Sequence, residues 1–160
     1  MKISVIAGNP KGKSRTLDAA ILAAGKLGGQ APATIVDVID LGSSLLEFGN
    51  PKVAASIESI RQSDAAIFAS PTFKGSYSGI LKLYLDQIGP DGLKGMLAFP
   101  LMLGASPYHA MAPDLLLKPV LVELGAICLA PGLYLLDKTY SEDPRLDAWV
   151  ERTKSTIMKT

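Results

Sequence analysis

Five short apolar runs alternate along this chain with segments in which apolar residues recur at helical spacing. Apolar runs of this length are typical of strands that are buried on both faces of a parallel sheet. Parallel neighbours need helical crossovers, so the alternation predicts a doubly wound α/β sheet. The expected strands are residues 3–7, 34–41, 65–69, 96–103 and 127–136, and the expected helices are 16–27, 51–62, 78–88, 115–124 and 145–158.

The number of strands selects among doubly wound folds. Five strands favour the flavodoxin-like order 2-1-3-4-5, because the dinucleotide-binding order normally uses six. We therefore predict a three-layer α/β sandwich with a five-stranded parallel sheet, formed by residues 1–160 as a single domain. Two prolines interrupt the pattern: Pro100 disfavours a fully hydrogen-bonded strand position, and Pro119 predicts a kinked or late-starting helix.

Composition and charge exclude several classes of function. The net charge is +1 with scattered charges, so the chain lacks the electrostatic footprint of a protein that binds nucleic acid or an anionic membrane. The single cysteine, Cys128, excludes an intramolecular disulfide, and its apolar surroundings favour a buried side chain over a reactive thiol. No window is long and apolar enough for a membrane span or a signal peptide. We expect a cytoplasmic protein without a metal site.

The first candidate ligand-binding loop is GNPKGKSRT, residues 8–16, which follows the first strand. In open α/β sheets, ligands bind where strands end and helices begin. Gly8 and Gly12 are expected to let backbone N–H groups turn inward, and Ser14 and Thr16 add hydroxyls beside a helix N-terminus, which favours anions. Positive charge comes from Lys11, Lys13 and Arg15. The loop therefore predicts a phosphate-binding site.

The same stretch also matches a relaxed phosphate-loop pattern of nucleotide triphosphatases. The string AGNPKGKS ends in Gly12, Lys13 and Ser14, as that pattern requires. However, the third strand ends at Ser70 with no acidic residue for magnesium, and Asp40 is only a weak substitute. A triphosphatase is the disfavoured alternative, and a site for one phosphate group without magnesium is expected.

The loop after the third strand contains more aromatic and hydrogen-bonding side chains than an ordinary connection. In SPTFKGSYS, Pro71 and Phe73 can hold shape, while Ser76, Tyr77 and Ser78 can form hydrogen bonds. Strands one and three flank the switch point of the predicted sheet, so their loops share one crevice. A third loop, GASPYHAMAPD, follows the fourth strand. The alternative interpretation of the second loop is a plain surface loop that leads into a capped helix.

Together these loops resemble the NADPH-dependent FMN reductase family, and most closely the small flavodoxin-like flavin reductases of sulfonate use. The resemblance covers the chain from Met1 to about Asp137 in the same order and spacing. It is most specific in the second loop, PTFKGSYSG, which runs from Pro71 to Gly79 and continues into a helix.

The resemblance implies how an FMN would be held. The FMN phosphate would lie in the first loop, against Asn9, Lys11, Ser14, Arg15 and Thr16. The ribityl chain and isoalloxazine ring would border the second loop, at Pro71, Thr72, Phe73, Lys74, Gly75 and Ser76. The third loop would close over the other side of the ring with Gly104, Ala105, Ser106 and His109. His109 is expected to position a ligand, because hydride transfer needs no protein base.

The function that the resemblance implies is reduction of FMN by NADPH or NADH, in which the flavin carries the chemistry and no side chain is catalytic. Electrons would leave as FMNH2 for a flavin-dependent monooxygenase, or pass to a small acceptor such as a quinone or azo compound. A homodimer or homotetramer is also implied, with residues 79–88 and 45–48 as apolar contacts. The alternative is a flavodoxin-type electron carrier without a dinucleotide site, which the net charge of +1 disfavours because such carriers are usually strongly acidic.

Overall fold

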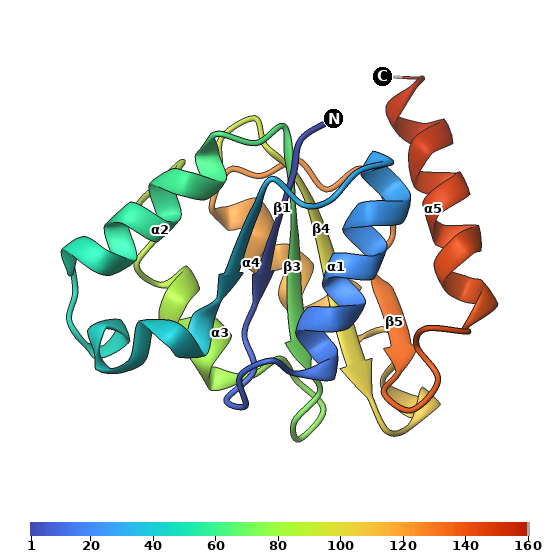
Figure 1. Ribbon diagram of the computed structural model, residues 1–160, viewed down its shortest axis with the longest axis horizontal. Coiled ribbons are helices and arrows are strands. Elements are labelled where there is room, and N and C mark those ends of the chain that lie inside the picture. The colour runs from blue at the N-terminus through green and yellow to red at the C-terminus, as the bar shows by residue number, and fades with distance from the viewer. Residues whose placement is uncertain (160) are drawn as a thin grey trace.

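The structure, a computed structural model, describes residues 1–159 and has a five-stranded sheet at its centre (Figure 1). All neighbouring strands pair in parallel, and their order is β2-β1-β3-β4-β5, which confirms the predicted flavodoxin-like arrangement. The strands are β1 Ile3–Ala7, β2 Thr34–Asp37, β3 Ala65–Pro71, β4 Leu97–Gly104 and β5 Leu133–Leu136. The helices are α1 Arg15–Gly28, α2 Pro51–Arg61, α3 Gly79–Leu85, α4 Lys118–Glu123 and α5 Pro144–Ile157.

Two apolar clusters hold the helices against the two faces of the sheet. Val5 and Ile67 belong to the cluster that packs against α1 and α5, whereas Ile6 and Phe68 belong to the cluster that packs against α2, α3 and α4. This alternation follows from the two-residue period of a strand. Burial of each such side chain contributes about 1.5–3 kcal/mol. The buried side chains of the sheet and its helices therefore stabilise the fold, so the loops at the edge of the sheet are available for ligand binding.

The second strand is shorter than predicted. It ends at Asp37, and the chain continues as a 3-10 helix, η1 Val38–Leu46, with a kink at Gly42, where φ is 58° and ψ is −137°. Val38, Leu41 and Leu45 are its buried residues. Their spacing of three and four is helical, whereas the alternation of Val36 and Val38 suggested a longer strand.

Pro100 lies inside β4 without the loss of a ladder hydrogen bond. The Ala98 N–H donates to the Ile127 carbonyl on the β5 side, at 2.9 Å. Alternate residues of a strand face the same neighbour, so Pro100 also faces the β5 side, where pairing begins only at Leu101 and Leu133. The predicted fifth strand is thus an isolated bridge at Ile127 followed, after a break, by the four residues of β5.

The fourth helical segment does not start late, which was one of the two alternatives predicted from Pro119. A π-helical turn, η3 Pro113–Leu117, leads directly into α4, because Leu117 and Lys118 both have right-handed helical φ and ψ. Pro119 lies in the first turn of α4, just after this change of helix type. No helix within residues 1–159 is long and apolar enough to cross a bilayer.

The carboxyl ends of all five strands lie at one end of the molecule, opposite the chain termini (Figure 1). The loops after β1, β3, β4 and β5 therefore meet at this end. It is also where the start of α1 lies, because a short loop joins it to β1.

Candidate functional site

A cavity of about 350 Å³ lies at this carboxyl edge of the sheet. It is formed by the loops after β1, β3, β4 and β5 together with the first turn of α1. Its volume falls within the range of about 300–1,000 Å³ that is usual for small-molecule sites. The predicted site residues that line it are Asn9, Lys11, Ser14, Arg15, Thr16, Pro71, Thr72, Phe73, Gly104 and Ala105.

The first loop presents a helix start with free N–H groups. Asn9 Nδ2 donates to Thr16 Oγ1 at 3.0 Å, and Asn9 Oδ1 accepts from the Lys11 N–H at 2.9 Å, so this side chain ties the loop to the helix. Ser14 caps α1 and accepts from the Leu17 N–H at 3.3 Å. Within residues 1–159, no group accepts from the N–H of Arg15 or Thr16, as is usual at a helix start. Such a terminus favours a bound anion.

Gly8 is required by packing rather than by backbone conformation. A Cβ at this position would lie 2.3 Å from Leu81 Cβ, because the first turns of α3 pack directly on the loop. The prediction that the Gly8 N–H turns into the site is wrong, since it donates to the Ala69 carbonyl at 2.8 Å. The residue of this loop with a left-handed conformation is Lys13, with φ of 50°.

Positive charges outnumber negative ones around the cavity. Lys11, Lys13 and Arg15 face it, as do the carboxylates Asp18 and Asp137. Arg15 Nη1 donates to the Asp137 carbonyl at 3.1 Å and lies 3.5 Å from Asp137 Oδ2, which ties the first loop to the end of β5. The electrostatic balance suits an anionic group at the start of α1.

Some lining residues were not predicted from the sequence as site residues, namely Asp18, Leu103 and Asp137, and Lys13 was predicted only as a positive charge of the first loop. A signal existed for Asp137, which follows the last strand, because the carboxyl ends of parallel strands meet at one edge. Asp18 lies one turn inside α1, and nothing in the sequence sets it apart.

Lys13 is held in its left-handed conformation by Asp37, at the end of β2. The Lys13 N–H donates to Asp37 Oδ2 at 3.0 Å, while Asp37 Oδ1 is buried without a hydrogen-bond partner within residues 1–159. Burial raises the pKa of Asp37 above its ordinary value of 3.8, the Lys13 N–H opposes the rise, and Asp40 adds to it. Ionisation of this carboxyl is therefore less favourable in the folded protein than in the unfolded chain.

The raised pKa of Asp37 makes a prediction about stability. The folded chain binds this proton more tightly than the unfolded chain, so the free energy of unfolding should fall as the pH rises from 3.8 through the raised pKa. Asp37→Asn keeps an oxygen acceptor for Lys13 and removes the charge. Urea denaturation of the flavin-free protein at several pH values should show that this variant is more stable than the wild type at neutral pH and has lost that slope. A variant that is less stable at neutral pH would refute the argument.

The second loop turns back on itself at the mouth of the cavity. The Phe73 N–H donates to the Ser76 carbonyl at 2.9 Å, and the Ser76 N–H donates to the Phe73 carbonyl at 3.1 Å. Lys74 and Gly75 have φ of 51° and 79°, as in a type I′ turn. The predicted site residues Lys74, Gly75 and Ser76 therefore form the tip of a tight turn outside the lining, while Phe73 is at the mouth, 49% exposed.

Two buried serines connect the second loop to the first. The Ser78 N–H donates to Ser70 Oγ at 2.8 Å, and Ser78 Oγ donates to the Gly8 carbonyl. Ser78 also caps α3, where it accepts from the Leu81 N–H at 3.2 Å. Because these hydroxyls are satisfied and buried, they fix the relative positions of the two loops.

The third loop contributes Gly104 and Ala105 to the cavity, while Ser106 and His109 lie outside its lining. Ser106 Oγ accepts from the Tyr108 N–H at 3.3 Å and caps the short 3-10 helix η2, Pro107–His109. A Cβ at Gly75 would lie 3.7 Å from the His109 ring, so the second and third loops approach each other there. His109 makes no hydrogen bond within residues 1–159, and its expected bond to a ligand stays a prediction.

The residues present fit an FMN. Free N–H groups and cations at the start of α1 suit its phosphate, and the apolar walls Pro71, Phe73 and Leu103 suit a flat ring. Thr72 lines the cavity as well, but its hydroxyl is buried beside the phenol of Tyr134 and faces the protein interior.

Comparison with known proteins agrees with this geometry. Residues 1–141 match the family described as NADPH-dependent FMN reductase. The FMN reductase (NADPH) of Escherichia coli is 32% identical over 116 residues, which are 71% of this chain and 61% of that protein. The NADH-dependent FMN reductase SfnF of Pseudomonas fluorescens is 28% identical over 152 residues, 89% of this chain and 80% of that protein.

Solved structures show the same likeness. The apo form of the NADH:FMN oxidoreductase EMOB superposes with a TM-score of 0.85 at 29% identity, covering 96% of this chain and 88% of that one. Oxidised Flavodoxin 1 from Bacillus cereus shares the fold, with a TM-score of 0.65 at 16% identity.

The match to the Escherichia coli relative spans 61% of that protein, which is less than two thirds of its length. The family match, by contrast, covers nearly all of this chain, including every residue that lines the cavity. This chain belongs to the NADPH-dependent FMN reductase family.

Proposed function

We propose that this protein is an NAD(P)H-dependent FMN reductase, which transfers a hydride from the nicotinamide to FMN. The observation that carries the proposal is a cavity lined both by apolar side chains and by the start of α1, where the N–H groups of Arg15 and Thr16 have no acceptor within residues 1–159. When bound, FMN supplies the redox chemistry, and the protein supplies binding and orientation.

The lining residues divide into two groups by what they can do for FMN. The N–H groups of Arg15 and Thr16, with Lys11 and Lys13, bind the phosphate. Pro71, Thr72, Phe73, Gly104 and Ala105 flank the ring and exclude water. In the proposal, Lys74, Gly75, Ser76, Ser106 and His109 act at the mouth, where the incoming nicotinamide cofactor passes.

The open mouth favours a flavin that exchanges with solution. Phe73, which forms part of the wall, is 49% exposed, and Lys74 and His109 beside it are also exposed. We assign NADPH or NADH as reductant, since relatives are named for each. Reduced FMN then serves a flavin-dependent monooxygenase, or electrons pass to a quinone or azo compound at the same opening.

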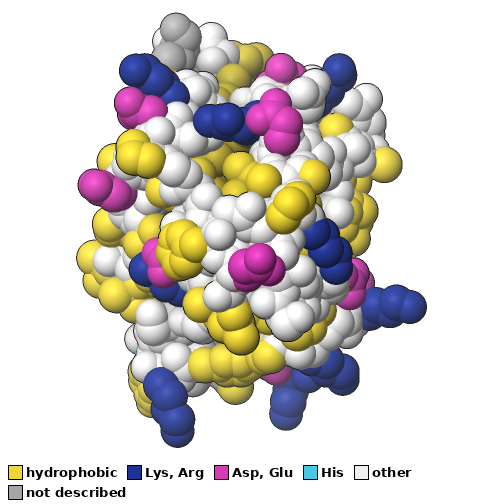
Figure 2. Space-filling view, turned by 90° about the vertical axis from the view of Figure 1, so that its left-hand side faces the viewer, with side chains coloured by type: hydrophobic (Ala, Val, Ile, Leu, Met, Phe, Trp, Pro, Cys, Tyr) yellow, Lys and Arg dark blue, Asp and Glu magenta, His cyan; other side chains and the backbone are white. Residues whose placement is uncertain are grey.

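We further assign this protein to the cytoplasm and to a homodimer or homotetramer. Exposed apolar side chains support the assembly: Leu46 is 75% exposed and Phe48 77% at the end of η1, and Leu115 is 65% exposed before α4. The side of the molecule seen in Figure 2 mixes hydrophobic groups with charges of both signs. A strongly acidic electron carrier would instead have a predominance of negative charge on its surface.

The test is anaerobic mixing of the protein and FMN with NADPH or NADH. The proposal predicts that the flavin absorbance bleaches with at least one of the two, at a rate far above that of free FMN. A flavodoxin-type carrier would bind FMN and leave its colour unchanged with both, which would overturn the proposal. A yellow purified protein would indicate tightly held FMN, and a colourless one an exchangeable flavin.

A further inference from the structure

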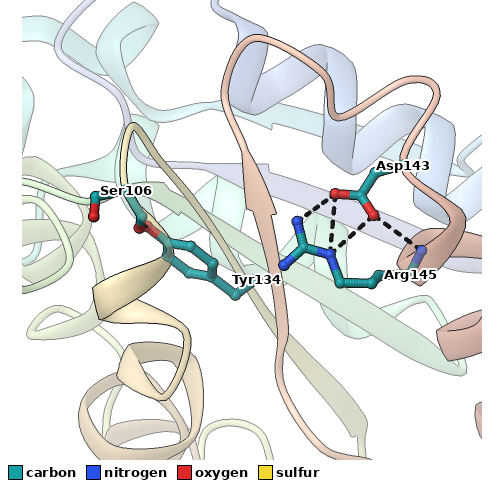
Figure 3. Close-up of polar contacts among 4 residues, drawn as sticks. All are labelled: Ser106, Tyr134, Asp143 and Arg145. Carbon is teal, nitrogen blue, oxygen red and sulfur yellow. Dashed lines mark hydrogen bonds and ion pairs between the residues drawn. The ribbon is translucent and has the colours of Figure 1, made fainter.

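The phenol of Tyr134 lies directly behind the wall of the cavity. Tyr134 is on β5, is 5% exposed, and its side chain points to the backbone of the third loop (Figure 3). Its hydroxyl donates to the Ser106 carbonyl at 2.7 Å. The β4–β5 pairing holds the chain as far as Gly104, whose carbonyl accepts from the Asp137 N–H at 3.0 Å. Beyond Gly104, the hydrogen bond from Tyr134 ties the third loop to the sheet.

Gly104 shows how closely this phenol supports the loop. A Cβ at Gly104 would lie 2.0 Å from the Tyr134 hydroxyl oxygen and 3.2 Å from Thr72 Cβ. Gly104 does not have a positive φ, so its lack of a side chain serves this contact and not a turn. The Tyr134 ring therefore fills the space under the one glycine of the third loop that lines the cavity.

The same hydroxyl lies beside Thr72. Burial raises the pKa of Tyr134, and a hydrogen bond with the Thr72 side chain opposes part of the rise, so the phenol stays protonated at neutral pH. Its proton is directed to the Ser106 carbonyl. Arg145, the cation beside the ring, does not compete, because its Nε lies 2.9 Å from Asp143 Oδ1 (Figure 3).

We propose that Tyr134 is a positioning residue for flavin binding: its hydroxyl holds the Ser106 carbonyl, and thereby the cavity face made by Ala105, just beyond the point where the strand pairing of β4 ends at Gly104. This inference rests on the proposed function and adds to it a residue outside the cavity lining. Without the hydroxyl, the third loop loses this attachment beyond Gly104, while the ring still fills the space beneath Gly104.

The test uses Tyr134→Phe in the full chain, which removes one oxygen and keeps the packing. In the flavin-free protein, hydrogen exchange of the amides of residues 104–110 should become faster than in the wild type. FMN affinity, followed by quenching of flavin fluorescence, should fall about fivefold, the equivalent of one ordinary hydrogen bond. The visible spectrum of the bound flavin should also shift, because one face of its site is less well defined.

Tyr84→Phe is the matched control. Tyr84 is fully buried on α3, and its hydroxyl accepts from Ser56 Oγ at 3.2 Å, away from the cavity. This variant should lose a comparable amount of stability and keep the wild-type FMN affinity, spectrum and exchange at residues 104–110. If Tyr134→Phe lowers stability but leaves all three unchanged, Tyr134 has a structural role alone and the inference is overturned. Failure of the wild type to bind FMN would instead overturn the proposed function itself.

Discussion

Replacement of Gly8 by alanine is expected to lower the free energy of unfolding by about 1–3 kcal/mol, as for an added methyl group in a packed core. The new Cβ would lie 2.3 Å from Leu81 Cβ and 2.7 Å from Leu81 Cα. Since one of these atoms is backbone, α3 or the first loop has to move. That movement also breaks the hydrogen bond from Ser78 Oγ to the Gly8 carbonyl. FMN affinity should therefore fall together with stability.

Gly79→Ala is the control for this substitution. Gly79 is the first residue of the same helix, and a Cβ there meets no atom within 4 Å. Alanine at this position should leave stability equal or slightly higher, because it restricts the unfolded chain. Denaturant unfolding measures both variants. A Gly8→Ala protein as stable as Gly79→Ala would show that the close approach of Leu81 to the loop is not present in solution.

Removal of the cations at the start of α1 should weaken FMN binding by about 10- to 100-fold, while riboflavin binding changes little. Riboflavin lacks the phosphate, so the difference isolates the contribution of that group. Lys11→Ala/Lys13→Ala removes two charges that face the cavity and retains the backbone bond of residue 13 to Asp37. Hydrogen bonds to charged groups are worth about 1.5–3 kcal/mol, from which the expected factor follows.

The control for this pair is Lys26→Ala, at the other end of α1. Lys26 Nζ lies 2.6 Å from Asp147 Oδ1 on the surface, and removal of such a pair has little effect. Flavin fluorescence titrations at two salt concentrations measure the FMN and riboflavin affinities of all three proteins. Higher salt should reduce the preference of the wild type for FMN over riboflavin. Equal losses of FMN and riboflavin affinity in the double variant would place the phosphate elsewhere.

Much of the fold could be predicted from the sequence because its signals are local and repeated. Apolar runs such as residues 3–7 and 65–69 are separated by helical segments, and this alternation predicts parallel strands. The end of β2 and the start of β5 could not be predicted, because they depend on which residues pair with the neighbouring strand and which pack against other elements in the folded protein. The alternation of Val36 and Val38 is typical of a strand, although Val38 already belongs to η1, which packs against α2 and α3.

The site could be predicted at the level of loops and less well at the level of roles. The position of the loops at strand ends, together with the family resemblance, correctly predicted that Asn9, Arg15 and Thr72 lie around one cavity. The roles of Gly8 and Gly104 depend on contacts with Leu81 and Tyr134, which are far away in the sequence. Lys74 to Ser76 were predicted to border the ring, but the hydrogen bonds between Phe73 and Ser76 turn this segment back at the mouth.

The most direct test of the account is the steady-state oxidation of NADPH and of NADH by the purified wild-type protein, with and without added FMN. The account predicts oxidation that depends on FMN, saturates as FMN is raised, and is slower at limiting FMN for Lys11→Ala/Lys13→Ala. Binding of FMN without oxidation of either nicotinamide cofactor would contradict it.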